Sequence, residues 1–261
     1  MARILIYLHR NGNIHDPCGY FLREIAACWQ ANGHELFVQH GPGERIDADI
    51  LVNHVDLTVV PTDHRPYMAQ YERTINAQVL DISKSTISRD LVTQSSGWEG
   101  AVIAKTDLNC GGWKEHDLGT GSTVPDANYL IFSSLGEVPD HIWQDSRFVV
   151  EKFLPEMRDG LYCLRTWMFL GDAETNSLSY SKSAIVKQHT VLRRVPTPRV
   201  PDELREIRKQ LNFDFGKFDY ALVDGRVVLY DANRTPSLGT FTRSEIRPRI
   251  EMLAAGLRSF L

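Results

Sequence analysis

The stretch from Phe213 to Pro236 reads FDFGKFDYALVDGRVVLYDANRTP. It contains two runs typical of β-strands, residues 215–223 and 226–233, separated only by an Asp-Gly pair. Such a pair between two strand-like runs is a strong short-range signal for a β-hairpin. We therefore expect two antiparallel strands here, in an α/β protein whose C-terminal part is of the α+β type.

Polar side chains on this hairpin indicate a metal site. Asp231 and Asn233 are two residues apart on the second strand, so their side chains share one face. If Asp219 joins them from the first strand, two carboxylates and an amide oxygen converge. This hard-oxygen set suits Mg²⁺, which usually also carries water and substrate phosphates. The alternative is a solvated hairpin whose polar residues face only water.

The register of the hairpin decides whether the two aspartates meet. A two-residue turn pairs Val223 with Arg226 and places Asp219 and Asp231 on opposite faces. A three-residue connection with a bulge at the turn glycine pairs Val223 with Val227 and sets Asp219 directly across from Asp231.

Composition describes an ordinary globular protein. The 261 residues are 43% hydrophobic and 24% charged, which allows one large domain or two small ones. A net charge of −4 favours neither nucleic acid nor an anionic membrane surface as a partner. The four scattered cysteines indicate reduced thiols, and no run approaches a membrane span or a signal peptide. We therefore expect a cytoplasmic protein that acts on a small-molecule or peptide substrate.

The first 82 residues alternate between strand-like and helix-like segments. Strands are expected at 3–8, 34–39, 49–55 and 77–82, and helices at 20–33 and 65–76. This alternation predicts a small parallel sheet covered by helices, as a Rossmann-like domain over residues 1–82.

The character of the sequence changes after Ser83. Strands are expected at 100–107, 148–156, 162–172 and 183–187, and helices at 83–95, 201–212 and 246–261. Residues 113–128 are polar and punctuated by Gly and Pro, which predicts a mobile loop.

Two lysines are candidates for binding phosphate. Lys105 ends an apolar strand and precedes Gly111 and Gly112, whose backbone N–H groups could close over phosphates. The lysine comes before the glycines, so this is not the P-loop pattern, and a plain surface loop is the alternative. Lys84, at the start of its helix, is a second candidate.

The segment from Glu151 to Glu156 could bind an adenine base. A buried strand offers Glu151, Lys152, Phe153 and Leu154 before a proline ends it. The backbone of such a strand end can read a base edge while apolar side chains cover the ring. Glu156 could then accept hydrogen bonds from ribose hydroxyls. An edge strand with a proline terminator is the alternative.

Arg165 and Lys187 are cations on strands that otherwise head for the core. An unpaired buried charge is costly, so each needs an anionic partner. A phosphoryl group or a developing acyl phosphate would suit the guanidinium of Arg165. A structural ion pair with Asp or Glu is the alternative for both.

In this order, the motifs resemble those of the ATP-grasp superfamily over about residues 83–240. The resemblance implies an ATP-grasp fold with a small nucleotide-lid subdomain at 83–150 and a C-terminal subdomain at 151–261. It implies that ATP and one or two Mg²⁺ ions bind, with catalytic roles for Arg165 and Lys187. The nucleotide contacts it implies are Lys84, Lys105, Gly111, Gly112, Glu151, Lys152, Phe153, Leu154 and Glu156. The implied metal ligands are Asp219, Asp231 and Asn233, with Asp231 where the superfamily usually has Glu.

The activity implied by the resemblance is ATP-dependent ligation. ATP-grasp enzymes mostly activate a carboxylate as an acyl phosphate, which an amine then attacks with release of ADP and phosphate. Two alternatives stay open: a kinase or phosphotransferase acting on a hydroxyl, and a nucleotide-binding module without catalysis. A homodimer is common for this type of fold.

Candidate acceptor-substrate contacts lie in the N-terminal domain. Ligands of α/β sheets bind beyond the carboxyl ends of the strands. The residues expected there are Asn13, His15, His54 and Asp56, and Arg234 after the hairpin is a further candidate. Ordinary loop polar residues are the alternative. A zinc site is not indicated, because no ligand spacing supports one.

Overall fold

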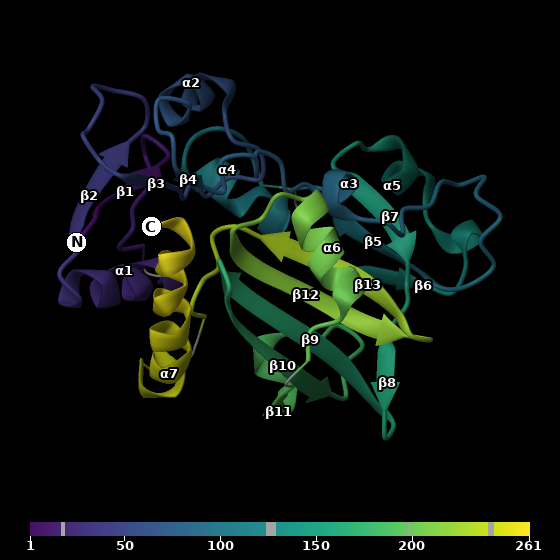
Figure 1. Ribbon diagram of the computed structural model, residues 1–261. Coiled ribbons are helices and arrows are strands. Elements are labelled where there is room, and N and C mark those ends of the chain that lie inside the picture. The colour runs from purple at the N-terminus through teal and green to yellow at the C-terminus, as the bar shows by residue number, and fades with distance from the viewer. Residues whose placement is uncertain (17–18, 124–128, 198, 240–242) are drawn as a thin grey trace.

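The described residues form three β-sheets with helices between and around them (Figure 1). The structure, a computed structural model, describes residues 1–261 except 17–18, 124–128, 198 and 240–242. Within the described residues, no helix is long and apolar enough to cross a bilayer. The described cysteines, Cys28, Cys110 and Cys163, are free thiols, as the sequence predicts, and Cys18 lies outside the described residues.

The N-terminal sheet has four parallel strands in the order β2-β1-β3-β4. Their bounds are β1 Arg3–Leu8, β2 Glu35–His40, β3 Ile50–Asn53 and β4 Thr74–Ile75. Helix α1, Phe21–Ala31, buries Leu22, Ile25 and Trp29 against this sheet. The predicted parallel sheet is confirmed.

The end of this sheet differs from prediction. Helix α2 covers only Arg65–Met68, and the fourth strand is β4 rather than 77–82. Asn76 ends the regular structure here, because its backbone is left-handed (φ 61°) and its side chain bonds to residues distant in the sequence. Its amide donates to the carbonyl of Phe215 at 2.8 Å and accepts from the N–H of Asp214 at 2.9 Å. The chain therefore turns here to join the C-terminal half.

A three-stranded antiparallel sheet in the order β6-β5-β7 lies in the region that the resemblance predicts to be a nucleotide lid, and we call it the lid sheet. Its strands are β5 Val102–Thr106, β6 Leu130–Phe132 and β7 Phe148–Lys152, and its helices are α3 Lys84–Ile87, α4 Trp113–Asp117 and α5 Asp140–Gln144. The helix predicted over 83–95 is therefore one turn long. Residues 90–92 instead run along β7, where Val92 donates to Val150 and Lys152 donates to Asp90. The predicted mobile loop contains helix α4, and residues 124–128 of it lie outside the described residues.

The large C-terminal sheet follows the order β11-β10-β9-β12-β13, with β8 paired to β9. Its strands are β8 Glu156–Arg158, β9 Leu161–Leu170, β10 Ala173–Ser181, β11 Val191–Pro196, β12 Phe215–Val223 and β13 Arg226–Asn233. Strand β10 was not expected, because its Thr, Asn and Ser residues carry little apolar signal. The strand predicted at 183–187 is wrong. Ser181 and Ser183 form a hydroxyl-bonded turn there, and the chain returns as β11.

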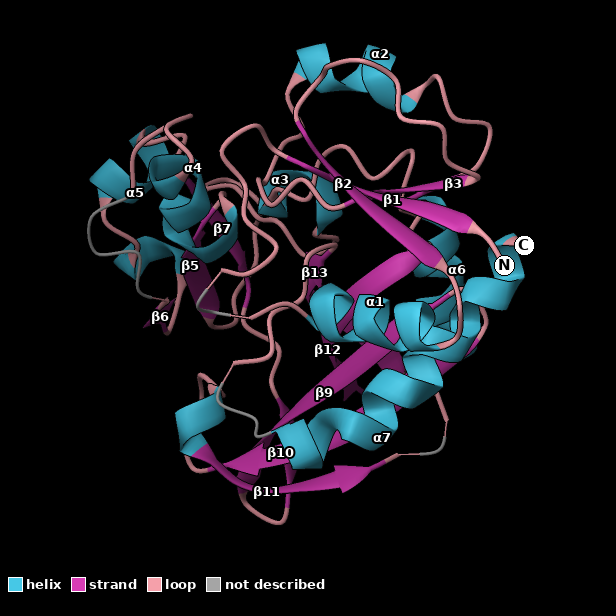
Figure 2. Ribbon diagram, turned by 90° about the vertical axis from the view of Figure 1, so that its left-hand side faces the viewer, coloured by secondary structure: helices cyan, strands magenta, loops and turns pink. Residues whose placement is uncertain are grey.

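Successive side chains of β9 point to opposite faces of the large sheet. Trp167 and Phe169 pack under α6, Asp202–Gln210, whereas Thr166 and Met168 face the other way. Helix α7, Arg243–Ala254, lies beside α1 and shares a core with it and with the N-terminal sheet (Figure 2). The free face of the large sheet is therefore left for a cavity.

Candidate functional site

The hairpin sets Asp219 directly across from Asp231. Its turn is the two-residue turn of one expected register, and its aspartate pairing is that of the other. The turn has two residues with left-handed backbones, and Val223 pairs with Arg226. The register then shifts, and Tyr230 is the extra residue that lets Asp219 pair with Asp231. The bulge expected at the turn thus lies six residues from Asp224, in mid-strand, where bulges can re-aim side chains.

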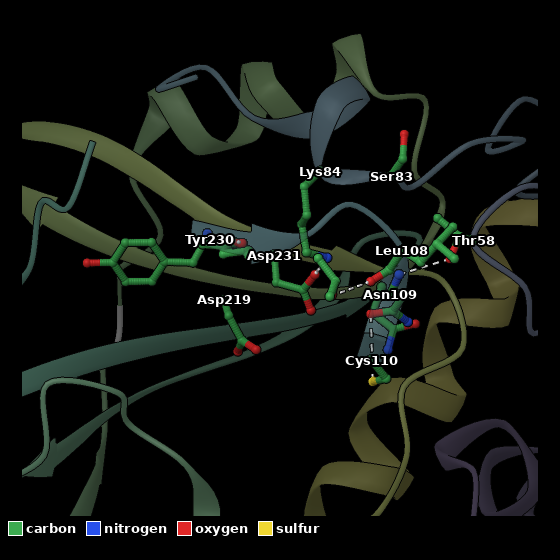
Figure 3. A network of polar contacts seen from close by, with 12 residues as sticks. Thr58, Ser83, Lys84, Leu108, Asn109, Cys110, Asp219, Tyr230 and Asp231 are labelled. Carbon is green, nitrogen blue, oxygen red and sulfur yellow. Dashed lines mark hydrogen bonds and ion pairs between the residues drawn. The ribbon is translucent and has the colours of Figure 1, made fainter. Parts of the chain in front are cut away.

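Each of these aspartates is held by a lysine, and Figure 3 shows Lys84 beside Asp231. The ammonium of Lys84 lies 2.5 Å from Asp231, and that of Lys217 lies 2.7 Å from Asp219. The hydroxyl of Thr166 also donates to Asp219, at 2.9 Å. Burial opposes ionisation of Asp231, but the nearby Lys84 and Lys217 outweigh it and hold the pKa of Asp231 below its usual value. Asp231 and Lys84 are therefore both charged at neutral pH.

Asn233 shares the strand face but has other contacts. Its side-chain oxygen accepts the backbone N–H of Thr235 at 2.8 Å. The hydroxyl of Thr235 in turn donates to Asp56 of the N-terminal domain. Asn233 therefore connects the hairpin to the N-terminal half, and its role as a metal ligand stays a prediction.

A second buried ion pair lies between the lid strands. Lys105 on β5 lies 2.5 Å from Glu151 on β7, and their side chains are 5% and 4% exposed. Lys105 also donates to the backbone carbonyl of Tyr230, the bulge residue, at 3.3 Å. The other carboxylate oxygen of Glu151 is buried with no hydrogen-bond partner among the described residues. An orphaned acceptor at such a place points to an absent donor.

Asp219, Asp231, Lys105 and Glu151 line a cavity of about 370 Å³ between the lid sheet and the large sheet, whereas Lys84 and Asn233 are not among its lining residues. Six basic side chains line it: Lys105, Lys152, Lys187, Lys217, Arg194 and Arg249. Among the residues that the structure describes, three carboxylates do so, those of Glu151, Asp219 and Asp231. The cavity is thus positive in a protein whose net charge is −4, and it suits an anionic ligand.

Lys187 differs from the other lysines of the cavity. Its ammonium lies 4.2 Å from the ring centroid of Tyr129, and the described residues offer it no carboxylate within ion-pair distance. A lysine without a carboxylate partner can bind an anion without breaking an existing pair.

The glycine segment lies against the same cavity. Cys110, Gly111 and Gly112 all have left-handed backbones, with φ of 48°, 67° and 75°. A Cβ on Gly112 would lie 3.1 Å from the backbone oxygen of Ser122, so the fold needs glycine there. Asn109 and Cys110 line the cavity, while the two glycines are buried behind them.

The predicted adenine segment is only partly on the cavity. Glu151, Lys152 and Phe153 line it, while the carbonyl of Leu154 accepts the hydroxyl of Tyr230 at 2.6 Å. The N–H groups of Lys152 and Phe153 already donate to backbone carbonyls. A base at this strand would therefore need other backbone groups of the segment.

Glu156 and Arg165 pair with each other instead of lining the cavity. The guanidinium of Arg165 donates to both carboxylate oxygens of Glu156, at 2.8 and 2.9 Å. Burial opposes the charged form of Glu156, but Arg165 and the N–H of Leu222 hold its pKa below the usual value. The structure thus favours the structural ion pair for Arg165, and leaves neither oxygen of Glu156 free for ribose.

A smaller cavity of about 40 Å³ lies at the carboxyl ends of β1 and β3. Of the predicted acceptor contacts, Asn13, His54 and Asp56 line it and the exposed His15 does not. His54 is 1% exposed, and neither ring nitrogen has a partner among the described residues. Burial and the nearby Arg234 lower the pKa of His54 to about 3.

Lys114 of helix α4 reaches into this smaller cavity. Its ammonium lies 2.6 Å from Asp16, 3.4 Å from Asp117 and 4.0 Å from Asp56. The lid segment that carries the glycines is therefore docked on the N-terminal domain.

Arg234 lies elsewhere than expected. It is fully buried, and its guanidinium donates to the backbone carbonyls of Val55, Leu57 and Val79. With these donors occupied by the protein, it is a structural clamp between the hairpin and the N-terminal loops, contrary to the expected substrate contact.

Sequence reasoning missed several residues of the site. Lys217 could have been found, because it is two residues before Asp219 and so shares its strand face. Arg194 and Arg249 could not, since β11 was not expected and the cavity joins elements far apart in the chain.

Comparison with known proteins identifies the fold. No protein-family model matches the sequence, and no curated protein is similar enough in sequence to count as a match. The ligase PsnB in complex with its minimal precursor superimposes with a TM-score of 0.57 at 13% identity, over 98% of this chain and 99% of that one. A RiPP-associated ATP-grasp ligase of Chryseobacterium gregarium, with ADP and leader and core peptide, gives 0.56 at 9%, over 100% and 95%.

A third solved structure, the D-alanine–D-alanine ligase of Bacillus anthracis, gives a TM-score of 0.53 at 11% identity, over 100% of this chain and 96% of that one. This chain therefore has the ATP-grasp fold, and the resemblance drawn from its sequence is confirmed. At such identities the likeness establishes the fold, and the reaction has to be argued from the site.

Proposed function

We propose that this protein is an ATP-dependent ligase that activates a carboxylate as an acyl phosphate and joins it to an amine. The observation that carries the proposal is the positive cavity with two aspartates paired across the hairpin, in a fold shared with ligases. ATP carries several negative charges, and in phosphoryl transfer the protein supplies mainly positioning and charge neutralisation.

The proposed phosphate contacts are Lys187 and Lys105 of the cavity, together with the buried Lys84 that pairs with Asp231. Lys187 binds without losing a carboxylate partner, whereas Lys105 and Lys84 exchange part of their pairing with Glu151 and Asp231 for phosphate oxygens. Gly111 and Gly112 shape the segment that covers the phosphates, and the segment from Glu151 to Leu154 contacts the base.

The donor set at the hairpin fits Mg²⁺. Asp219 and Asp231 are directly opposed, and the pKa of Asp231 lies below its usual value, so it is an anionic oxygen ligand. No group of three or more His, Cys, Asp or Glu in the described part of the chain could hold a metal ion. The remaining ligands would thus be Asn233, water and phosphate. When bound, the ion would neutralise the phosphate charge that the lysines leave over.

Two bond exchanges make up the reaction. A carboxylate oxygen of the substrate attacks the γ-phosphorus, and the bond to the bridging oxygen of ADP breaks with its electron pair going to ADP. The amine then attacks the acyl carbon, the C–O bond to phosphate breaks, and the amine loses a proton as the amide forms. Lys217, beside Asp219, is placed to offset the charge on the transferred phosphate.

The smaller cavity is the proposed acceptor subsite. Asn13, His54 and Asp56 line it, and Thr235 and Asn233 connect Asp56 to the hairpin. The acceptor is a small molecule or a peptide, and precursor or leader peptides accompany two of the similar ligases named above.

Thermal unfolding with Mg²⁺ and a non-hydrolysable ATP analogue tests the nucleotide site. Ligand at 100 times its Kd stabilises by about 2.7 kcal/mol, or several degrees in Tm. Lys187→Met should lose much of this shift without losing stability, because the substitution leaves no carboxylate of the described residues without its ion-pair partner. Lys182→Met, an exposed lysine of the same turn, is the control and should keep it. An equal shift in wild type and Lys187→Met would contradict the assignment.

Hydroxylamine separates the ligase from its alternatives. An acyl phosphate yields a hydroxamate with hydroxylamine, whereas a hydroxyl phosphotransferase yields none. Nucleotide binding without ADP release on any acid or alcohol would instead identify a binding module.

A further inference from the structure

The smaller cavity, at the carboxyl ends of β1 and β3, differs from the larger one in the sign of its charge. The carboxylates of Asp16, Asp56 and Asp117 line it, and Lys114 supplies its one ammonium group among the residues that the structure describes. Lys114 lies 2.6 Å from Asp16 and 3.4 Å from Asp117, but its 4.0 Å to Asp56 is beyond hydrogen-bond distance. Because the larger cavity is positive, a cationic group of a substrate is favoured in the smaller one.

Arg234 does not cancel this negative charge. Burial raises the pKa of Asp56, and Arg234 is among the groups close enough to oppose that change. However, Arg234 does not line the cavity, and its guanidinium donates to backbone carbonyls. Even when Arg234 is counted with Lys114, the three carboxylates of the cavity outnumber the two cations.

His54 offers an unused hydrogen-bonding group in the same cavity. Its ring lines the cavity, is 1% exposed and packs edge-on against the ring of Tyr20, with 4.7 Å between centroids. Neither ring nitrogen has a partner among the described residues. A buried polar group without a partner is costly, so the ring indicates a group that the cavity binds. Since the pKa of His54 is lowered to about 3, the ring is neutral near pH 7 and keeps one nitrogen as an acceptor.

The size of the cavity limits the group that it can hold. One water molecule needs about 10–15 Å³ of such space, so the cavity of about 40 Å³ takes about three water-sized groups. That is room for an ammonium group with one or two carbons, and not for a quaternary or branched amine. The hydroxyls of Tyr20 and Thr235 both donate to Asp56, which holds its carboxylate in place for such a group.

The two cavities are neighbours in the fold. Tyr20 lines the smaller cavity, and the next residue, Phe21, lines the larger one. The hydroxyl of Thr235 donates to Asp56 and also lies 3.2 Å from the side-chain oxygen of Asn233 on the hairpin. One threonine side chain therefore separates a group bound at Asp56 from the hairpin.

We propose that the smaller cavity binds an unbranched primary ammonium group of the acceptor, with Asp56 as its charge partner and His54 as its hydrogen-bond acceptor. The proposal rests on the proposed function, since it names the chemical class of the acceptor. The ammonium group comes either from a chain-terminal α-amine or from a lysine-like side chain, which share this chemistry.

Nuclear magnetic resonance of the histidine ring signals tests the proposal without nucleotide. The signal of His54 is identified by its absence from His54→Leu. At constant ionic strength, methylammonium should shift this signal in wild type in a saturable way. Methanol has a similar size but no charge, and tetramethylammonium has the same charge but is too large, so neither should shift it.

Two larger probes identify the source of the group. Glycinamide presents an α-ammonium group, and Nα-acetyl-lysine amide presents a side-chain ammonium group. A saturable shift of the His54 signal by one of them alone names that source, and shifts by both show that the cavity accepts either. No shift by either probe would overturn the proposal, because a chain attached to the ammonium group would then be excluded.

Variants locate the binding site, with the ring signal of the cavity-lining His9 as the readout. His54→Leu and Asp56→Asn should each weaken methylammonium binding roughly tenfold, the size of a lost hydrogen bond to a charged group. His54→Leu removes no hydrogen bond to a described residue, so it should fold as wild type does. His15→Leu, at an exposed histidine, and Asp63→Asn, at a half-exposed aspartate, change residues outside the cavity and should leave the affinity unchanged.

Three further results would overturn the proposal. No saturable shift with methylammonium would mean that the cavity holds only water, and an equal shift with methanol would mean that charge is not recognised. An unchanged affinity in either cavity variant would place the ammonium group elsewhere. Failure of the proposed function is distinguishable, because it removes the Tm shift with the ATP analogue and does not affect methylammonium binding, which is measured without nucleotide.

Discussion

At the level of single residues, the buried pair Lys105–Glu151 is expected to affect both the stability of the fold and, under the proposed function, nucleotide binding. Both side chains are about 5% exposed, so removing one partner leaves a charge in a poorly solvated place. Lys105→Met should therefore lower the free energy of unfolding by about 3 kcal/mol. The double variant Lys105→Met/Glu151→Gln should recover most of that loss, as measured by urea unfolding.

The nucleotide shift separates the two roles of this pair. The double variant should be stable but lose much of the shift, because the phosphate contact is gone. A double variant as unstable as the single one would show that Lys105 stabilises the fold by something other than neutralising Glu151.

His54 should make stability depend on pH. Its folded pKa is about 3, while an unfolded histidine titrates near 6.5. Between these values the unfolded chain binds a proton that the folded chain does not, so stability falls as pH drops below about 6.5. The slope is about 1.4 kcal/mol per pH unit for one such group. His54→Gln should reduce the slope between pH 6.5 and 5 by about that amount.

Urea unfolding of both proteins at several pH values measures this difference. His9 and His64 also have lowered pKa values through burial and contribute in the same direction. His54→Gln should therefore keep part of the dependence. An unchanged slope would mean that His54 is solvated in the folded protein.

The sequence was enough to identify the two hairpin aspartates as a pair that could face each other, because their spacing and the turn signal are local. It did not identify the partner of Arg165. Whether a cation on a strand meets phosphate or a carboxylate depends on β8, which brings Glu156 across from β9 only in the folded chain.

At the level of elements, helix α4 couples the lid to the N-terminal domain. Its Lys114 bonds to Asp16, and the carboxylate of Glu115 accepts the backbone N–H of Thr58 at 2.7 Å. Lys114→Met should loosen the glycine segment and weaken nucleotide binding roughly fivefold to tenfold, and it should also lower the free energy of unfolding, because it leaves the largely buried Asp16 and Asp56 without this cation. Titration of the ATP analogue, followed by thermal shift, measures this.

Lys209→Met is the control for that change, since Lys209 forms an exposed pair with Glu206 on α6, away from the cavity. Equal affinities in wild type and Lys114→Met would show that docking of α4 does not contribute to the nucleotide site.

Strand and helix types followed largely from the sequence where the pattern was strong, as in β1, α1, α6 and the hairpin. The sequence did not predict the element type where pairing with distant strands overrides the local preference. Residues 90–92 pair with β7 although their neighbours favour helix, and polar β10 is a strand because β9 and β11 flank it. The bulge at Tyr230 also depends on residues outside its own strand. Asp219 of β12 pairs with Asp231 beside the bulge, and Lys105 of β5 donates a hydrogen bond to the carbonyl of Tyr230.

At the level of the whole molecule, the two ends of the chain share one core. Residues of β1 and α1 pack with α7 and with Phe215 of β12, and the two termini lie close together in Figure 2. The sequence could predict the N-terminal sheet as a separate unit, but not this joint, because the joint is made of contacts between residues far apart in the chain, such as Trp29 and Ala254.

Arg234 is the polar part of that joint. Four backbone carbonyls of the N-terminal loops, those of Val55, Leu57, Thr58 and Val79, accept its hydrogen bonds, and its side chain is fully buried. Arg234→Met fills a similar volume but leaves these carbonyls without donors, each at about 1–3 kcal/mol. We expect the free energy of unfolding to fall by about 3 kcal/mol or more.

The shape of the urea unfolding transition tests whether Arg234 joins the two halves of the molecule. If Arg234 joins the two halves, Arg234→Met should broaden the urea transition or split it, with the N-terminal half losing hydrogen-exchange protection first. Arg247→Met, an exposed arginine on α7, should unfold as wild type does. A variant that stays cooperative and loses less than about 1 kcal/mol would show that the apolar core of α1, α7 and β1 holds the halves together without the clamp.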